Sequence, residues 1–124
     1  MIFIDANVLL EVILRRRHAK ACEDLLIKDE SKAISILSID LVMYFLERNK
    51  LKWSPVKKFL ESFIWLPITD SDAQWAFTNI KGNDFEDPLQ VACAIREGCR
   101  RFVTLDIALS KRYAQNIAID LISK

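Results

Sequence analysis

Glycine and proline are scarce in this sequence, which has only two glycines and three prolines among its 124 residues. This scarcity argues against a low-complexity or intrinsically disordered chain. Hydrophobic residues make up 52% of the sequence, enough to bury a substantial core without the help of disulfides. The length is that of one domain, so we expect residues 1–124 to fold as a single unit.

An excess of charge of one sign is also missing. The 18 basic and 17 acidic residues leave a formal net charge of +1. No overall electric field therefore draws the protein toward nucleic acid, and such affinity would have to come from local patches or from a bound cation. The charge balance neither supports nor excludes an enzyme that acts on nucleic acid.

The sequence has few cysteines and no long apolar run. Cys22, Cys93 and Cys99 lack the spacing of metal ligands and lie mostly among apolar residues, so we interpret them as reduced thiols of the core. The N-terminal residues MIFID have no basic region and contain an acid, unlike a secretory signal. No apolar stretch approaches the roughly 20 residues of a spanning helix. These features predict a cytoplasmic protein without a membrane partner.

Short β-branched and aromatic runs alternate with segments of helical periodicity. The expected strands are residues 2–4, 33–37, 66–68, 101–105 and 117–119. The segments between them carry helix-starting signals, such as the Ser-Pro pair at 54–55 and the Asp-Pro pair at 87–88. Such alternation predicts a three-layer α/β/α fold around a central, mostly parallel sheet of four or five strands.

Three aspartates occupy positions where an open parallel sheet gathers its ligands. Asp5 follows the first strand, Asp106 follows the strand at 101–105, and Asp87 begins the helix that leads into that strand. Ligands of such folds bind beyond the carboxyl ends of the strands, so these acids are expected to meet there. Clustered carboxylates repel one another unless a cation is present, and an all-oxygen ligand set selects Mg²⁺ or Mn²⁺.

Helix capping offers a simpler role for each of the same aspartates. Asp5 and Asp106 lie between a strand and a helix, and Asp87 precedes Pro88, the arrangement of a good cap followed by a first helical residue. Taken singly, each acid is explained by capping. The convergence of all three is what raises the metal site as an alternative.

The segments around these aspartates resemble motifs of the PIN domain family. Residues 4–10, IDANVLL, look like the opening of PIN domains; residues 84–90, DFEDPLQ, resemble the third acidic motif; and residues 102–106, FVTLD, are similar to the fourth. The resemblance implies the residue roles: the catalytic, metal-binding side chains are Asp5, Asp87 and Asp106, and the supporting ones are Asn7 and Thr104.

One acid of the PIN pattern is absent from its expected place. Most active PIN domains have a second acid, usually Glu, in the helix that follows a Ser at the end of the second strand. At the equivalent spacing this chain has Leu41, counted from Ser35, and Tyr44, counted from Ser38. Asp40 is one residue from the first position, a rotation of about 100° around the helix, and it either replaces the acid or complements the helix dipole.

The resemblance also implies activity and partners. It predicts a Mg²⁺- or Mn²⁺-dependent endoribonuclease that cleaves single-stranded RNA, and small stand-alone PIN domains are often VapC-type toxins of toxin–antitoxin pairs. Asp84 is an auxiliary ligand or a loop acid in this scheme. The alternative is a catalytically weakened PIN-like module that binds RNA or a protein. Expected partners are RNA, an antitoxin and a second copy of the chain.

Overall fold

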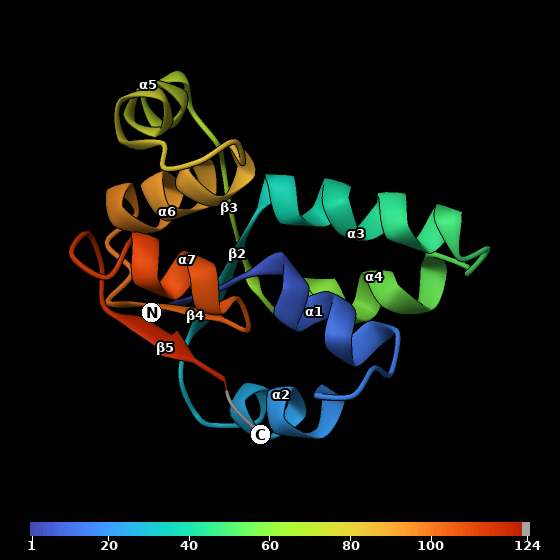
Figure 1. The fold of residues 1–124 in the computed structure, drawn as a ribbon. Helices are drawn as coiled ribbons and strands as arrows, with labels where there is room; N and C mark the ends of the chain where they lie inside the picture. The colour runs from blue at the N-terminus through green and yellow to red at the C-terminus, as the bar shows by residue number, and fades with distance from the viewer. Residues whose placement is uncertain (123–124) are drawn as a thin grey trace.

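The central sheet has five strands, all parallel. The structure is a computed structural model and describes residues 1–122. The order of the strands across the sheet is β3-β2-β1-β4-β5 (Figure 1). The strands are β1 (Ile2–Ile4), β2 (Lys32–Ser35), β3 (Ile64–Leu66), β4 (Arg101–Thr104) and β5 (Ile119–Leu121). The expected parallel α/β sheet is confirmed, and β3 and β5 are its edge strands.

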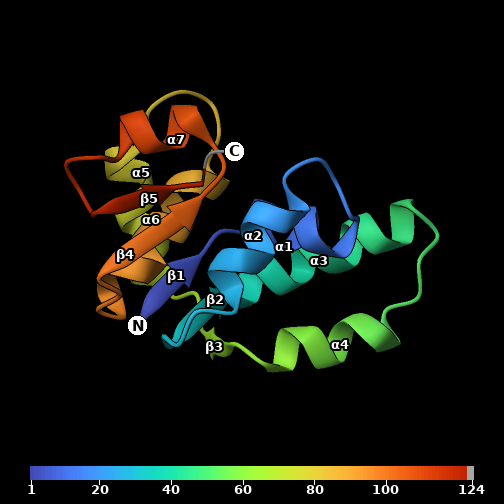
Figure 2. The same ribbon diagram turned by 90° about the horizontal axis from the view of Figure 1, so that it is seen from below.

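Helices cover both faces of this sheet. They are α1 (Ala6–Ile13), α2 (Ala19–Leu26), α3 (Ile36–Arg48), α4 (Ser54–Glu61), α5 (Asp70–Asn79), α6 (Glu86–Arg96) and α7 (Ile107–Arg112). Figure 2 shows α1 to α4 on one side of the sheet and α5 to α7 on the other. The predicted three-layer architecture is therefore confirmed.

Alternation along the central strands explains the two layers of core. Ile2 and Ile4 of β1 pack into the core beneath α1, α3 and α4, whereas Phe3 between them packs into the core beneath α6 and α7. Phe3 stacks on Phe102 of β4, with ring centroids 5.0 Å apart. Because both faces of the central strands are buried, β1 is apolar throughout and the middle residues of β2 and β4 are apolar.

Two helix starts differ from those that the sequence predicts. The apolar segment after the second expected strand predicts a helix capped by Ser38. Ser35 caps α3 instead, because its hydroxyl accepts the Ser38 backbone N–H at 3.1 Å. The helix expected to begin after Asp87 begins at Glu86 instead, so Asp87 is its second residue and caps nothing. Pro88 is tolerated because N–H groups of the first turn have no partner within the helix.

The cysteines match the interpretation from sequence, whereas two strands lie elsewhere than expected. All three cysteines are buried and unpaired, and Gly98 follows the C-cap of α6 with a φ of +74°. The strand expected at residues 66–68 is β3 at Ile64–Leu66, because Pro67 cannot donate to the sheet and ends it, and the strand expected at 117–119 is β5 at Ile119–Leu121. Among the described residues, no helix is long and apolar enough to cross a membrane.

The chain order creates a switch point next to β1. From β1 the chain moves outward to β2 and β3 and then returns to β4 on the opposite side of β1. Crossovers on either side of such a point leave the carboxyl ends of the two central strands open as a crevice. The residues that directly follow β1 and β4 border this crevice.

Candidate metal site

Asp5 is the innermost acid of the crevice. It follows β1 directly and is only 3% exposed. One carboxylate oxygen accepts the backbone N–H of Ala6 at 2.8 Å, which caps α1, and the other accepts the hydroxyl of Thr104 at 2.7 Å. Two donors from different elements therefore fix the orientation of this carboxylate.

Thr104 organises the junction between β1 and β4. Its hydroxyl oxygen accepts the backbone N–H of Asp106 at 3.0 Å and the side-chain amide of Asn7 at 3.4 Å. With both lone pairs used, the hydroxyl hydrogen is free to point only at Asp5. Asn7 also accepts the backbone N–H of Leu105 at 3.4 Å. The two residues predicted to support the site, Asn7 and Thr104, thus contact its buried acid directly or through one another.

Asp106 borders the same crevice from the end of β4. One of its carboxylate oxygens accepts the backbone N–H of Leu109 at 3.1 Å, so it caps α7. The capping role inferred from sequence therefore holds for Asp5 and Asp106, but not for Asp87. Each capping interaction uses a single oxygen, and the second oxygen of Asp106 is left for another partner.

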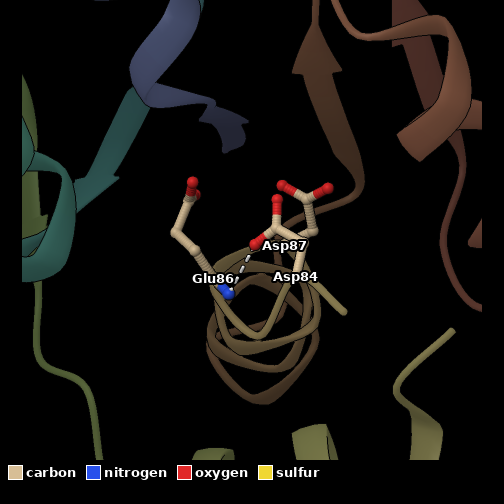
Figure 3. Close-up of side chains that lie close together, drawn as sticks. All are labelled: Asp84, Glu86 and Asp87. Carbon is tan, nitrogen blue, oxygen red and sulfur yellow. Dashed lines mark hydrogen bonds between the residues drawn. The ribbon is translucent and has the colours of Figure 1, made fainter. Parts of the chain in front are cut away.

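The first turn of α6 carries a tight acidic group. Carboxylate oxygens of Asp84, Glu86 and Asp87 all lie within 4.8 Å of one another (Figure 3). Asp84 accepts the backbone N–H of Glu86 at 2.9 Å and is exposed, whereas Asp87 is only 6% exposed. One oxygen of Glu86, Oε2, is fully buried and has no hydrogen-bond partner, while Gln90 hydrogen-bonds the same carboxylate.

Burial and repulsion between charges raise the pKa values of Asp5, Glu86 and Asp87. Loss of hydration raises the pKa of Asp5 from 3.8 to about 7, with further contributions from the charges of Asp87 and Asp106, against the opposing hydrogen bonds from Thr104 and Ala6. Burial also raises the pKa of Glu86 to about 7, and the charge of Asp5 is the next largest cause. The three acids predicted as metal ligands therefore interact electrostatically in the folded chain.

Asp87 shows the same behaviour from the other side of the crevice. Burial raises its pKa to about 7, followed by the charges of Asp84, Glu86 and Asp106, while the cation of Arg112 lowers it. Because Asp5, Glu86 and Asp87 lose their protons only at unusually high pH in the metal-free protein, the site lacks compensating positive charge. Oxygen ligands of this kind fit Mg²⁺ or Mn²⁺.

Asp40 lies outside this group. Its side chain is exposed on α3 and lines a shallow apolar hollow with Ile36, Leu37 and Leu89, among others. The α3 side of the crevice is instead closed by neutral polar groups. Ser35 donates to the side-chain oxygen of Gln90 at 2.5 Å, and the amide of Gln90 donates to Ser38 at 2.8 Å. No acid of α3 replaces the one missing from the sequence pattern.

Glu86 is the acid that sequence reasoning missed. The Asp-Pro pair predicts a helix that begins after Asp87, and in that prediction Glu86 lies in the preceding loop without a defined direction. The available signal was the spacing of Glu86 and Gln90, four residues apart and hence on one helical face. That face is directed at the start of α3.

Comparisons with known proteins agree with the fold. The family model of the PIN domain matches residues 2–115, and a search of curated proteins gives no match. A toxin–antitoxin complex from Klebsiella pneumoniae has a chain that is 18% identical with a TM-score of 0.78, covering 100% of this chain and 99% of its own.

Two further solved structures share this fold. VapBC2 from Rickettsia felis, bound to a DNA fragment from its promoter, contains a chain that is 21% identical with a TM-score of 0.77, covering 99% of this chain and 100% of its own. VapC20 from Mycobacterium tuberculosis, a toxin that cleaves the sarcin–ricin loop, is 14% identical with a TM-score of 0.74, covering 95% of this chain and 97% of its own. At these identities the likeness is one of fold.

Proposed function

This chain belongs to the PIN domain family, and on that basis we propose that it is a Mg²⁺- or Mn²⁺-dependent endoribonuclease that cleaves single-stranded RNA. The observation that carries the proposal is the meeting of acids from three parts of the chain at the switch point of the sheet. The charges of Asp87 and Asp106 raise the pKa of Asp5 there, and the charge of Asp106 also raises the pKa of Asp87, as expected for acids grouped around the place of a cation.

The donor set fits a hard divalent cation. All the available ligand atoms are carboxylate oxygens, and one of them, Oε2 of Glu86, is buried without any partner. A bound Mg²⁺ or Mn²⁺ would activate a water molecule for attack on the phosphodiester and stabilise the leaving oxygen. The chain itself holds the carboxylate of Asp5 through the Thr104 hydroxyl and places Asp87 near enough for its charge to act on Asp5.

An exposed aromatic ring, Phe77, packed on the half-buried Phe85 beside the acids supports a single-stranded substrate. Phe77 of α5 is 72% exposed and lies against Phe85, which directly precedes Glu86, with ring centroids 4.6 Å apart. Arg112 lies over Gly82 of the intervening loop and forms no ion pair with the described residues. Unpaired bases stack on exposed aromatic rings, and a free guanidinium binds phosphate.

Phe77→Ala is expected to weaken the binding of a short unstructured RNA by about fivefold or more, the loss of one stacking contact. Fluorescence anisotropy in EDTA measures this binding without cleavage. Ile27→Ala is the matched control, because Ile27 is 81% exposed at the end of α2 on the opposite face of the sheet. Unchanged affinity in Phe77→Ala would remove the aromatic pair from the RNA-binding surface.

The toxin of a toxin–antitoxin pair is the biological role that we propose, with action in the cytoplasm. All three of the structures compared above come from toxins or from toxin–antitoxin complexes. Large apolar side chains remain exposed, Trp53, Trp65 and Tyr44 among them, and an antitoxin or a second copy of the chain would cover such surface. Co-purification with a small protein encoded beside it tests this role.

Cleavage of an unstructured RNA tests the enzymatic proposal directly. We expect wild-type protein to cleave it in Mg²⁺ or Mn²⁺ and not in EDTA, and Asp87→Asn to be slower by about 100-fold or more. Asp40→Asn, an exposed acid outside the cluster, serves as the control of matched charge and should retain the wild-type rate. A wild-type protein that binds RNA but never cleaves it would establish the non-catalytic alternative.

A further inference from the structure

We propose that Glu86 is a metal ligand of this chain and supplies the carboxylate that the PIN sequence pattern expects from α3. This inference rests on the proposed function, because it concerns the same cation. It adds a specific residue that neither the motif positions nor the capping signals identified. The acid would reach the cation from the first turn of α6 instead of from the helix after β2.

The placement of Glu86 is the first support. Figure 3 shows its side chain rising from the first turn of α6 on the side of α3, while Asp84 and Asp87 rise on the side of β4. Its carboxylate nevertheless lies within 4.8 Å of oxygens of both other acids. Glu86 thus borders the crevice from the direction in which an acid of α3 would have approached.

An unpaired buried oxygen is the second and independent support. Oε2 of Glu86 has no hydrogen-bond partner and is fully buried. Gln90 hydrogen-bonds the same carboxylate, and Asp87 beside it is only 6% exposed. Buried polar oxygens are nearly always satisfied by protein, water or an ion, so a buried carboxylate oxygen without a donor next to a second buried acid indicates a missing cation.

The surrounding groups explain why no protein cation serves instead. Gln90, one turn after Glu86, is engaged by Ser35 and Ser38 and is neutral. Arg112 is the cation that acts on Asp87, and it is exposed at the end of α7. A divalent ion is the species that satisfies both Glu86 and Asp87 at once.

Calorimetric titration with Mn²⁺ tests the assignment without relying on cleavage. Glu86→Gln keeps the shape of the side chain and is expected to weaken Mn²⁺ binding by more than about 100-fold, beyond the roughly 10- to 100-fold effect of a residue that only orients a ligand. Asp84→Asn is the matched control, because it removes an equal charge from an exposed member of the same group. We expect Asp84→Asn to weaken binding by about threefold or less.

The outcomes separate this inference from the proposed function. Equal Mn²⁺ affinity in Glu86→Gln and wild type, an equal loss in Asp84→Asn, or no Mn²⁺ binding by wild type would each overturn the role of Glu86. If Glu86→Gln binds Mn²⁺ as tightly as wild type and still cleaves RNA only with metal, Glu86 is not a ligand and the proposed nuclease function stands. Thermal unfolding in EDTA checks that each variant is folded before titration.

Discussion

Replacing Asp5 with asparagine is expected to stabilise the metal-free protein at pH 8 and to abolish its stabilisation by Mn²⁺. The carboxylate is 3% exposed, and burial together with the charges of Asp87 and Asp106 raises its pKa to about 7. Above that pH the metal-free protein must hold a buried, repelled negative charge. Asparagine has the same shape and carries no charge.

The sign of the pH dependence follows from the raised pKa. Asp5 ionises near its ordinary value of 3.8 in the unfolded chain and near about 7 in the folded one. Between these values the folded state keeps a proton that the unfolded state has released, so the free energy of unfolding falls as pH rises. The full penalty, on the order of 4 kcal/mol, is reached above pH 7 and vanishes below pH 4.

The net gain of the Asp5→Asn variant should be smaller than this penalty. Asparagine loses the hydrogen bond from the Thr104 hydroxyl, so we expect an increase of about 2 kcal/mol at pH 8 and little change near pH 4. Mn²⁺ at about 100 times its dissociation constant should stabilise wild type by about 2.7 kcal/mol and leave the variant unchanged.

Urea unfolding of wild type and Asp5→Asn at pH 4 and pH 8, in EDTA and in Mn²⁺, measures the unfolding free energies that these predictions compare. Asp40→Asn is the control, because it removes the same charge from an exposed position on α3. If Asp5→Asn is less stable than wild type in EDTA at pH 8, the ionised carboxylate of Asp5 does not destabilise the metal-free protein. Equal Mn²⁺ stabilisation of both proteins would remove Asp5 from the metal site.

The acids at strand ends were predictable because their signals are local. A strand of three or four apolar residues that stops at an aspartate fixes where that aspartate lies, and parallel strands bring such ends together. Asp5 and Asp106 therefore appear where expected, linked by Thr104. The sheet was predicted for the same reason, since buried parallel strands are marked by continuous apolar runs.

The rest of the site depends on contacts that no local signal encodes. Ser35 meets Gln90, 55 residues away, and that pairing fills the α3 side of the crevice with neutral groups. The start of α6 lies two residues before the start that the capping signal predicts, and this difference places Glu86 in the first helical turn. Cap rules locate helix ends to within a residue or two, which suffices for a fold but not for naming a ligand.

Asp72→Ala is expected to destabilise the protein by about 3 kcal/mol, because it breaks a largely buried ion pair that joins α5 to α6. The side chain of Asp72 is 2% exposed. It accepts Nε of Arg96 at 2.9 Å and Nη2 at 3.1 Å, and it also accepts the backbone N–H of Thr69 at 2.9 Å in a capping box.

Alanine leaves each of those donors without its acceptor. Arg96 keeps its bonds to the carbonyl of Pro67 and to Glu97, and it is 29% exposed, so part of the loss is recovered through water. Asp70→Ala is the matched control, since Asp70 lies in the same first turn of α5 but is exposed, and we expect it to cost about 0.5 kcal/mol.

Urea unfolding in EDTA compares the two variants, and Mn²⁺ titration of each folded protein separates stability from the site. The ion pair lies at the C-terminal end of α6 and the acids lie at its first turn, so Asp72→Ala should lower the unfolding free energy without changing Mn²⁺ affinity. A loss below about 1 kcal/mol would mean that Arg96 is held by Pro67 and Glu97 alone. A loss of Mn²⁺ affinity would instead mean that the packing of α5 positions the acids of α6.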